Sequence, residues 1–166
     1  MKRVEIPDSY GEPILIATNK RLADAVLATR LRLLMACGGK GLCATCHVYV
    51  EKGAESLSPV TPREAISLRM LSDRKPCSRL SCQAKVTGDG IQVRLPQGRY
   101  LESTTDLESL IGRRAEQAIL HPVTGALLIA EGKIVTRSRL RELSSVDVDI
   151  AEMKTRSLTI DGVKVR

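Results

Sequence analysis

The chain has 166 residues, with 26 Lys and Arg against 19 Asp and Glu, so its formal net charge is +7. This length suits one domain or two small ones. The chain contains three Tyr and neither Phe nor Trp, so the core must be aliphatic and nucleic-acid binding by base stacking is not expected. No apolar run reaches the roughly eighteen residues of a membrane span.

Secondary structure near the N-terminus is predicted as two short strands followed by a helix. Residues 4–6 and 14–16 are β-prone and flank a turn-rich segment, 7–11. Apolar residues over 22–28 have helical spacing, and Asn19 is a candidate helix cap. The N-terminus lacks the apolar core of a secretory signal, which predicts a cytoplasmic location.

The next segment is a glycine-rich loop with three cysteines. Cys37, Cys43 and Cys46 have the spacing C-x5-C-x2-C, and Cys82 follows after thirty-five further residues. Four thiolates suit a [2Fe–2S] cluster, in which each iron takes two cysteine sulfurs and two bridging sulfides. The sequence therefore predicts iron and one-electron chemistry.

The residues between the first two cysteines fit an anionic cluster. Gly38, Gly39 and Gly41 permit backbone conformations that turn successive N–H groups toward sulfur. Lys40 adds a positive charge at the tip of the loop. Hydrogen bonds, charge and solvent exposure of this kind set the reduction potential of a cluster.

Other uses of these cysteines fit the spacing less well. A structural zinc site usually has two short Cys/His pairs, and only Cys43 and Cys46 form one. Disulfides are disfavoured by the uneven clustering, and a thioredoxin-like pair would leave Cys37 and Cys82 without a role. The fifth cysteine, Cys77, is interpreted as a free thiol near the cluster, with a ligand role as the alternative.

Two later segments add β-strands and a basic stretch. Residues 48–50 and 91–95 are β-prone. Between them, residues 69–79 carry four positive charges against one negative, an excess that fits either an acidic partner or a solvated basic face without a dedicated partner. The candidate partner surface consists of Arg69, Arg74, Lys75 and Arg79.

Residues 1–98 resemble [2Fe–2S] ferredoxins of the adrenodoxin and putidaredoxin type. The resemblance is carried by C-x5-C-x2-C, by the run from Cys43 to Val50 and by Arg-Leu-Ser-Cys-Gln around Cys82. It implies an α+β fold, the β-grasp, in which a helix crosses a mixed sheet. It also implies the four ligands Cys37, Cys43, Cys46 and Cys82, with His47 supporting the cluster loop through a ring hydrogen bond. Related ferredoxins commonly carry an acidic helix where this chain is basic.

Residues 99–166 differ in character: they contain no cysteine, eleven Lys and Arg, and ten Asp and Glu. We expect a second, small β-rich module with a strand over 126–130, a helix over 137–143 capped by Thr136, and an Asp-Gly hairpin over 157–165. His121 is interpreted as a loop residue without a partner. Short motifs here are faintly similar to a small module of the largest subunit of bacterial RNA polymerase.

The chain is predicted to be an electron-transfer protein and not an enzyme, because it has no dinucleotide fingerprint and no acid–base constellation. Its 1–98 domain would carry single electrons between protein partners, and the 99–166 module would dock one of them. The alternative is an iron–sulfur subunit or an assembly or regulatory factor of a larger complex, with the cluster as a fixed relay or redox sensor. No nucleic-acid partner and no membrane span are expected, and docking to a membrane complex stays open.

Overall fold

The larger of two sheets contains the N-terminal half of the chain. In this computed structural model the backbone is described for residues 1–164 and the side chains for residues 1–158. The strand order is β2-β1-β5-β3-β4. β1 is parallel to β5, and the other neighbours are antiparallel. The strands are β1 (Lys2–Glu5), β2 (Ile14–Ile16), β3 (His47–Lys52), β4 (Ser78–Leu80) and β5 (Ile91–Arg94).

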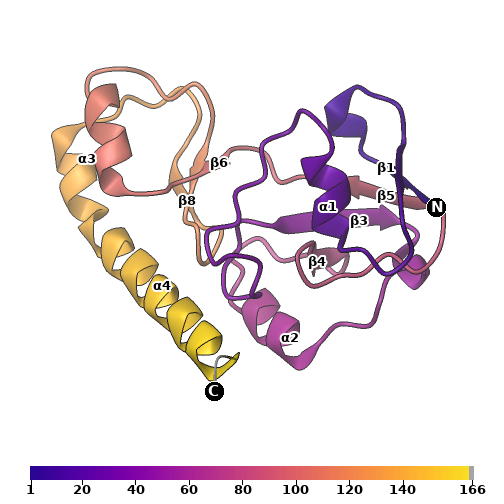
Figure 1. The fold of residues 1–166 in the computed structure, drawn as a ribbon. Helices are drawn as coiled ribbons and strands as arrows, with labels where there is room; N and C mark the ends of the chain where they lie inside the picture. The colour runs from indigo at the N-terminus through magenta and orange to yellow at the C-terminus, as the bar shows by residue number, and fades with distance from the viewer. Residues whose placement is uncertain (165–166) are drawn as a thin grey trace.

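Helix α1 (Leu22–Leu27) crosses this sheet, and α2 (Pro62–Arg69) lies beside β4 (Figure 1). Short 3-10 turns cover Pro7–Ser9 and Ala54–Ser56. A mixed sheet crossed by a helix is the β-grasp arrangement, and the predicted fold class is confirmed. The core is aliphatic, with Val4, Leu22, Val48 and Ile91 all fully buried.

The predicted cap of α1 is wrong. The residue before the helix is Arg21, which makes no side-chain capping bond. Asn19 lies two residues earlier in a left-handed conformation, with φ of 68°. Asn tolerates this conformation better than most residues, so it serves the preceding turn instead.

The second part of the chain has its own sheet and core. The sheet order is β6-β7-β8, and the core includes Leu101, Leu107, Ile119, Val135 and Val146. This part appears on the left of Figure 1. Its elements are β6 (Arg99–Tyr100), the 3-10 helix η3 (Thr104–Leu110), β7 (Ile119–Leu120), β8 (Leu127–Ile129), α3 (Arg137–Glu142) and α4 (Ser144–Lys164).

The small second sheet and the cap of α3 are as predicted, since the Thr136 side chain accepts a hydrogen bond from the backbone N–H of Arg139. The hairpin predicted over 157–165 is wrong. Helix α4 runs through the Asp-Gly pair, and the last residue of the predicted range lies outside the described backbone. Val146, Ile150 and Met153 are buried at helical spacing, and packing of such a face outweighs a local turn signal.

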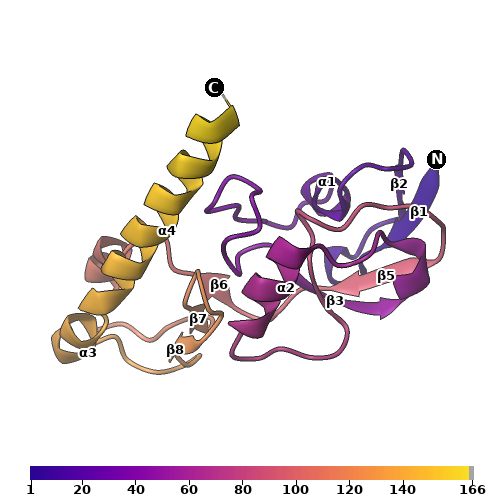
Figure 2. The same cartoon turned by 90° about the horizontal axis from the view of Figure 1, so that it is seen from below.

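The two parts meet at the cysteine loop. Figure 2 shows the loop between α1 and β3 directed toward α4, which rises beside it. Within the described residues, no helix is long and apolar enough to cross a membrane.

Candidate metal centre

The four cysteines predicted as ligands lie together because β3 pairs with β4. Cys46 directly precedes β3, and Cys82 follows β4 by two residues. The antiparallel register places His47 opposite Leu80, and the backbone N–H of Ser81 donates to the carbonyl of Cys46 at 3.0 Å. Cys37, Cys43, Cys46 and Cys82 are each at most 4% exposed.

Cys37 packs with Cys43 in one buried cluster, and Cys46 packs with Cys82 in another. A hydrogen bond from Cys43 lowers the pKa of Cys37 against the opposing effect of burial, while the same bond and burial raise the pKa of Cys43. In the same way, a hydrogen bond from Cys46 lowers the pKa of Cys82, while that bond and burial raise the pKa of Cys46. Among the described residues, no group of three or more Cys, His, Asp or Glu is arranged to hold one metal ion. A [2Fe–2S] cluster needs two cysteine sulfurs on each of its two irons, and two pairs of cysteines match that requirement.

The backbone between Cys37 and Cys43 stabilises negative charge on sulfur. Gly38, Gly39 and Gly41 have φ values of 71°, 78° and 73°, a left-handed region that favours glycine. The backbone N–H groups of residues 39, 40 and 42 hydrogen-bond to the sulfur of Cys37 and lower its pKa. Amides turned toward sulfur in this way stabilise a thiolate at Cys37.

Cys77 lies apart from these four residues. It precedes β4 whereas Cys82 follows that strand, so the two thiols lie at opposite ends of β4. The carbonyl of Cys77 accepts a hydrogen bond from the backbone N–H of Val50 at 2.9 Å. Its thiol is partly exposed, consistent with the interpretation as a free thiol.

A buried ion pair supports the cluster side of β4. Arg79 Nε donates to Glu64 Oε1 at 2.7 Å, and the same oxygen accepts from the backbone N–H of Leu80 at 2.9 Å. Glu64 is fully buried and the Arg79 side chain is 11% exposed. Arg79 therefore joins α2 to β4 and does not belong to an exposed partner surface, which corrects the sequence prediction. Glu64 was not singled out from the sequence, because nothing local links it to an arginine fifteen residues away.

His47 supports β4 instead of the loop itself. Its Nε2 is 2.8 Å from Ser78 Oγ, which also accepts from the backbone N–H of Lys75. The ring lies edge-on to Tyr49 with centroids 4.7 Å apart. Burial lowers the pKa of His47 and Lys75 acts in the same direction, against the opposing effect of Asp73. The predicted ring hydrogen bond exists, but it fixes the turn that leads into β4.

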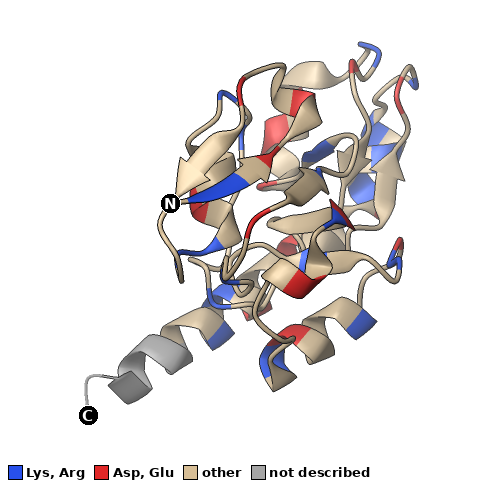
Figure 3. Cartoon of the chain, turned by 90° about the vertical axis from the view of Figure 1, so that its right-hand side faces the viewer, with Lys and Arg blue, Asp and Glu red and all other residues tan. Residues whose placement is uncertain are grey.

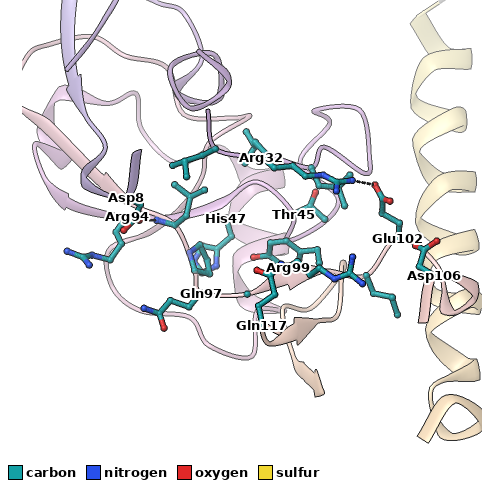
Figure 4. Close-up of a pocket in the computed structure, with 18 residues that line it drawn as sticks. Asp8, Arg32, Thr45, His47, Arg94, Gln97, Arg99, Glu102, Asp106 and Gln117 are labelled. Atoms are coloured by element: carbon teal, nitrogen blue, oxygen red, sulfur yellow. Dashed lines mark hydrogen bonds and ion pairs between the residues drawn. The ribbon is translucent and has the colours of Figure 1, made fainter. Parts of the chain in front are cut away.

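A cavity of about 430 Å³ lies at the junction of the two parts of the chain. Thr45 and His47 line it from the first part (Figure 4), and Tyr100 and Leu101 line it from the second. Arg32 and Glu102 form an ion pair beside it at 3.1 Å. Within the described structure, Nδ1 of His47 is a buried atom without a hydrogen-bond partner. The cavity is large enough for several waters.

His121 is not the isolated loop residue that the sequence suggested. Its Nε2 is 2.9 Å from Asp149 Oδ2 of α4, and its Nδ1 accepts from the backbone N–H groups of Val123 and Thr124. These bonds close the turn 121–125 and tie it to α4. The sequence showed the turn, but not the helix that would bring Asp149 to it.

A buried set of paired cysteine sulfurs on a β-grasp sheet defines an iron–sulfur electron carrier. Residues 6–87 match the family described as the 2Fe-2S iron-sulfur cluster binding domain. The chain is similar to rhodocoxin of Rhodococcus erythropolis, at 38% identity over 96 residues, covering 55% of this chain and 90% of rhodocoxin. It is also similar to a 2Fe-2S ferredoxin of Escherichia coli, at 34% identity over 80 residues, covering 48% of this chain and 72% of that one.

Among solved structures, an ISC-like [2Fe-2S] ferredoxin from Pseudomonas putida superposes with a TM-score of 0.52 at 25% identity, covering 58% of this chain and 93% of that one. The chain belongs to the [2Fe–2S] ferredoxins. Its cofactor is a [2Fe–2S] cluster, and it transfers electrons to and from protein partners. None of these relatives supports the resemblance of residues 99–166 to RNA polymerase, which stays a prediction.

Proposed function

We propose that Cys37, Cys43, Cys46 and Cys82 hold the cluster, with Cys37 and Cys43 on one iron and Cys46 and Cys82 on the other. The observation that carries this assignment is that Cys37 and Cys43 pack in one buried cluster and Cys46 and Cys82 in another, with each cysteine at most 4% exposed. The bound cluster supplies a one-electron redox centre. The amides around Cys37 and the Gln83 side chain, whose Nε2 donates to Cys82 Sγ at 3.4 Å, offset its negative charge.

Single replacements of these cysteines by Ser test the assignment. Each of the four variants is expected to lose the cluster or hold it weakly, measured as iron and sulfide per chain after anaerobic purification. Cys77→Ser is the matched control, and its visible spectrum should equal that of the unchanged protein. An indispensable Cys77 together with a dispensable Cys82 would contradict the assignment.

We further propose that the protein carries electrons between partners in the cytoplasm, a reducing compartment that suits free thiolates. The division into a 1–98 ferredoxin domain and a 99–166 module is supported by two separate sheets and two separate aliphatic cores. The docking of a partner by residues 99–166 stays a prediction.

The partner surface that we propose lies at the end of α2 and in the segment after it. Arg69, Arg74 and Lys75 are exposed there, and Lys75 Nζ lies 4.3 Å from the centre of the Tyr49 ring. Leu68, next to Arg69, packs with Cys46 and Cys82, so this surface adjoins the cluster site. Such a surface fits an acidic protein partner.

We propose that the protein has no nucleic-acid partner. In Figure 3, positions of Lys and Arg alternate along the ribbon with positions of Asp and Glu. Residues 99–166 carry nearly balanced charge. A dedicated nucleic-acid surface would require clustered basic residues.

A further inference from the structure

Helix α4 contacts the ligand loop directly. Ser157 Oγ donates to the backbone carbonyl of Cys37 at 3.0 Å. Lys40 Nζ in turn donates to Ser157 Oγ at 2.8 Å and to the Ser157 carbonyl at 3.0 Å. Ser157 lies 120 residues after Cys37 and is 9% exposed. The lysine at the tip of the loop is thus bound to the C-terminal helix.

One turn earlier on the same face of α4, Met153 covers the loop with apolar atoms. It is 3% exposed and packs in one cluster with Cys37, Leu42 and Cys43. Cys37 and Cys43 are the two cysteines that we assign to one iron. The C-terminal part of the chain therefore supplies part of the wall around that pair.

The turn 121–125 contacts the other end of the loop. The backbone N–H of Ala44 donates to the carbonyl of Pro122 at 2.8 Å, and that of Ser72 donates to the carbonyl of Thr124 at 2.9 Å. His121 of this turn contacts Asp149 of α4. Helix and turn are therefore joined to each other and hold the loop at two places.

We propose that residues 99–166 complete the cluster pocket, with Met153 and Ser157 of α4 excluding water from the Cys37–Cys43 side and fixing the loop. This inference rests on the proposed ligand assignment. Reduction adds negative charge to the cluster, and removal of water from an anionic centre disfavours that charge. The contacts of α4 therefore lower the reduction potential and slow the loss of iron to solvent.

The test uses the full chain with the double substitution Met153→Ala and Ser157→Ala. The matched control is Val148→Ala with Leu158→Ala, on the same helix at side chains that are 57% and 71% exposed. Two quantities are measured under anaerobic conditions: the midpoint potential by spectroelectrochemical titration, and the rate of iron transfer to a ferrous chelator. Circular dichroism reports whether α4 remains helical.

We expect the double variant to have a more positive potential and several-fold faster iron transfer, with the control unchanged. Loss of the cluster in the double variant alone would also support the inference. Ser157→Thr keeps the hydroxyl and should behave like the unchanged protein.

An unaltered potential and iron-transfer rate in a double variant with native helix content would overturn the inference. Lower thermal stability without a change of potential would overturn it as well, because it would show a purely structural contact. In both cases the cluster would still be present and the proposed function would stand. Absence of a two-iron cluster from the unchanged protein would overturn both.

Discussion

At the scale of single residues, the site depends on backbone conformations that only glycine adopts easily. The three loop glycines have positive φ, and the amides that follow them contact the Cys37 sulfur. These residues were predictable because a short loop that combines glycines with closely spaced cysteines is typical of cluster binding. The contact of Lys40 with Ser157 was not predictable, since a lysine at a loop tip looks the same whether or not a distant helix covers it.

Gly39→Ala tests whether the loop conformation serves the cluster. The backbone strain of a left-handed Ala is about 1–2 kcal/mol. A Cβ here would also come within 3.0 Å of the Arg21 and Met35 side chains, beside Cys82. We expect reduced cluster content after purification, measured as iron per chain.

Gly90→Ala is the matched control for this experiment. Its φ is also 78°, and a Cβ there meets no atom within 4 Å. The control should lose a similar amount of stability from backbone strain and keep a full cluster. Equal cluster content in the two variants would show that the conformation of Gly39 has no particular role.

At the scale of secondary-structure elements, β3, β4 and α2 assemble the second pair of proposed ligands. Antiparallel pairing of β3 with β4 brings Cys46 to Cys82, and the Glu64–Arg79 pair attaches α2 to β4. Strand β3 was predictable from a short β-prone run, whereas β4 and α2 were not expected. The ion pair was not, because the sequence shows Arg79 only as one of several neighbouring cations.

Glu64→Ala should be strongly destabilising. It would leave the Arg79 guanidinium without its carboxylate and the backbone N–H of Leu80 without an acceptor. Removal of one partner of a buried pair costs about 3–5 kcal/mol. The measurement is the free energy of unfolding in urea at constant ionic strength.

The matched control is Glu51→Ala. Glu51 pairs with Arg94 at 2.8 Å, and the two side chains are 35% and 48% exposed. Exposed pairs of this kind contribute about 0–1 kcal/mol. Similar destabilisation by the two variants would contradict the structural role assigned to Glu64.

At the scale of the whole molecule, the ferredoxin part was predictable and the position of the second part was not. The cysteine loop was recognisable from local sequence and the β-grasp sheet only through the resemblance to ferredoxins, whereas the Asp-Gly pair near the C-terminus favoured a hairpin over the observed α4. The buried face of α4 is set by contacts with residues far away in the sequence, among them Leu107 and Leu42. Such contacts leave no local signal.

Small charged oxidants should detect the basic surface of Arg69, Arg74 and Lys75, because its charge changes how often they meet the site beside it. Arg69→Glu with Arg74→Glu should slow oxidation of the reduced protein by anionic ferricyanide and accelerate oxidation by a cationic cobalt complex. Both effects should shrink as salt rises. Stopped-flow absorbance gives the rates.

Arg137→Glu with Arg141→Glu changes the net charge equally on α3, in the other part of the chain. This control variant should change the two oxidation rates less than Arg69→Glu with Arg74→Glu does. Identical effects of the two double variants would show that net charge alone decides the rates, and would argue against a local partner surface.

A chain truncated after Gly98 should still assemble its cluster, because all four proposed ligands and the first aliphatic core precede that point. It should release iron faster than the full chain, since Met153 and Ser157 are missing. Iron content and chelator kinetics check both expectations. A truncated protein that takes up no iron would show that residues 99–166 are required for assembly.

The most direct test of the cofactor is electron paramagnetic resonance of the anaerobically purified protein, before and after one-electron reduction, with iron, sulfide and zinc measured on the same sample. We predict about two irons and two sulfides per chain, no signal when oxidised, and one unpaired spin per pair of irons when reduced. We also predict a negative midpoint potential, as expected for a cluster with four cysteine ligands. Zinc in place of iron, or the signal of a single iron, would contradict the account.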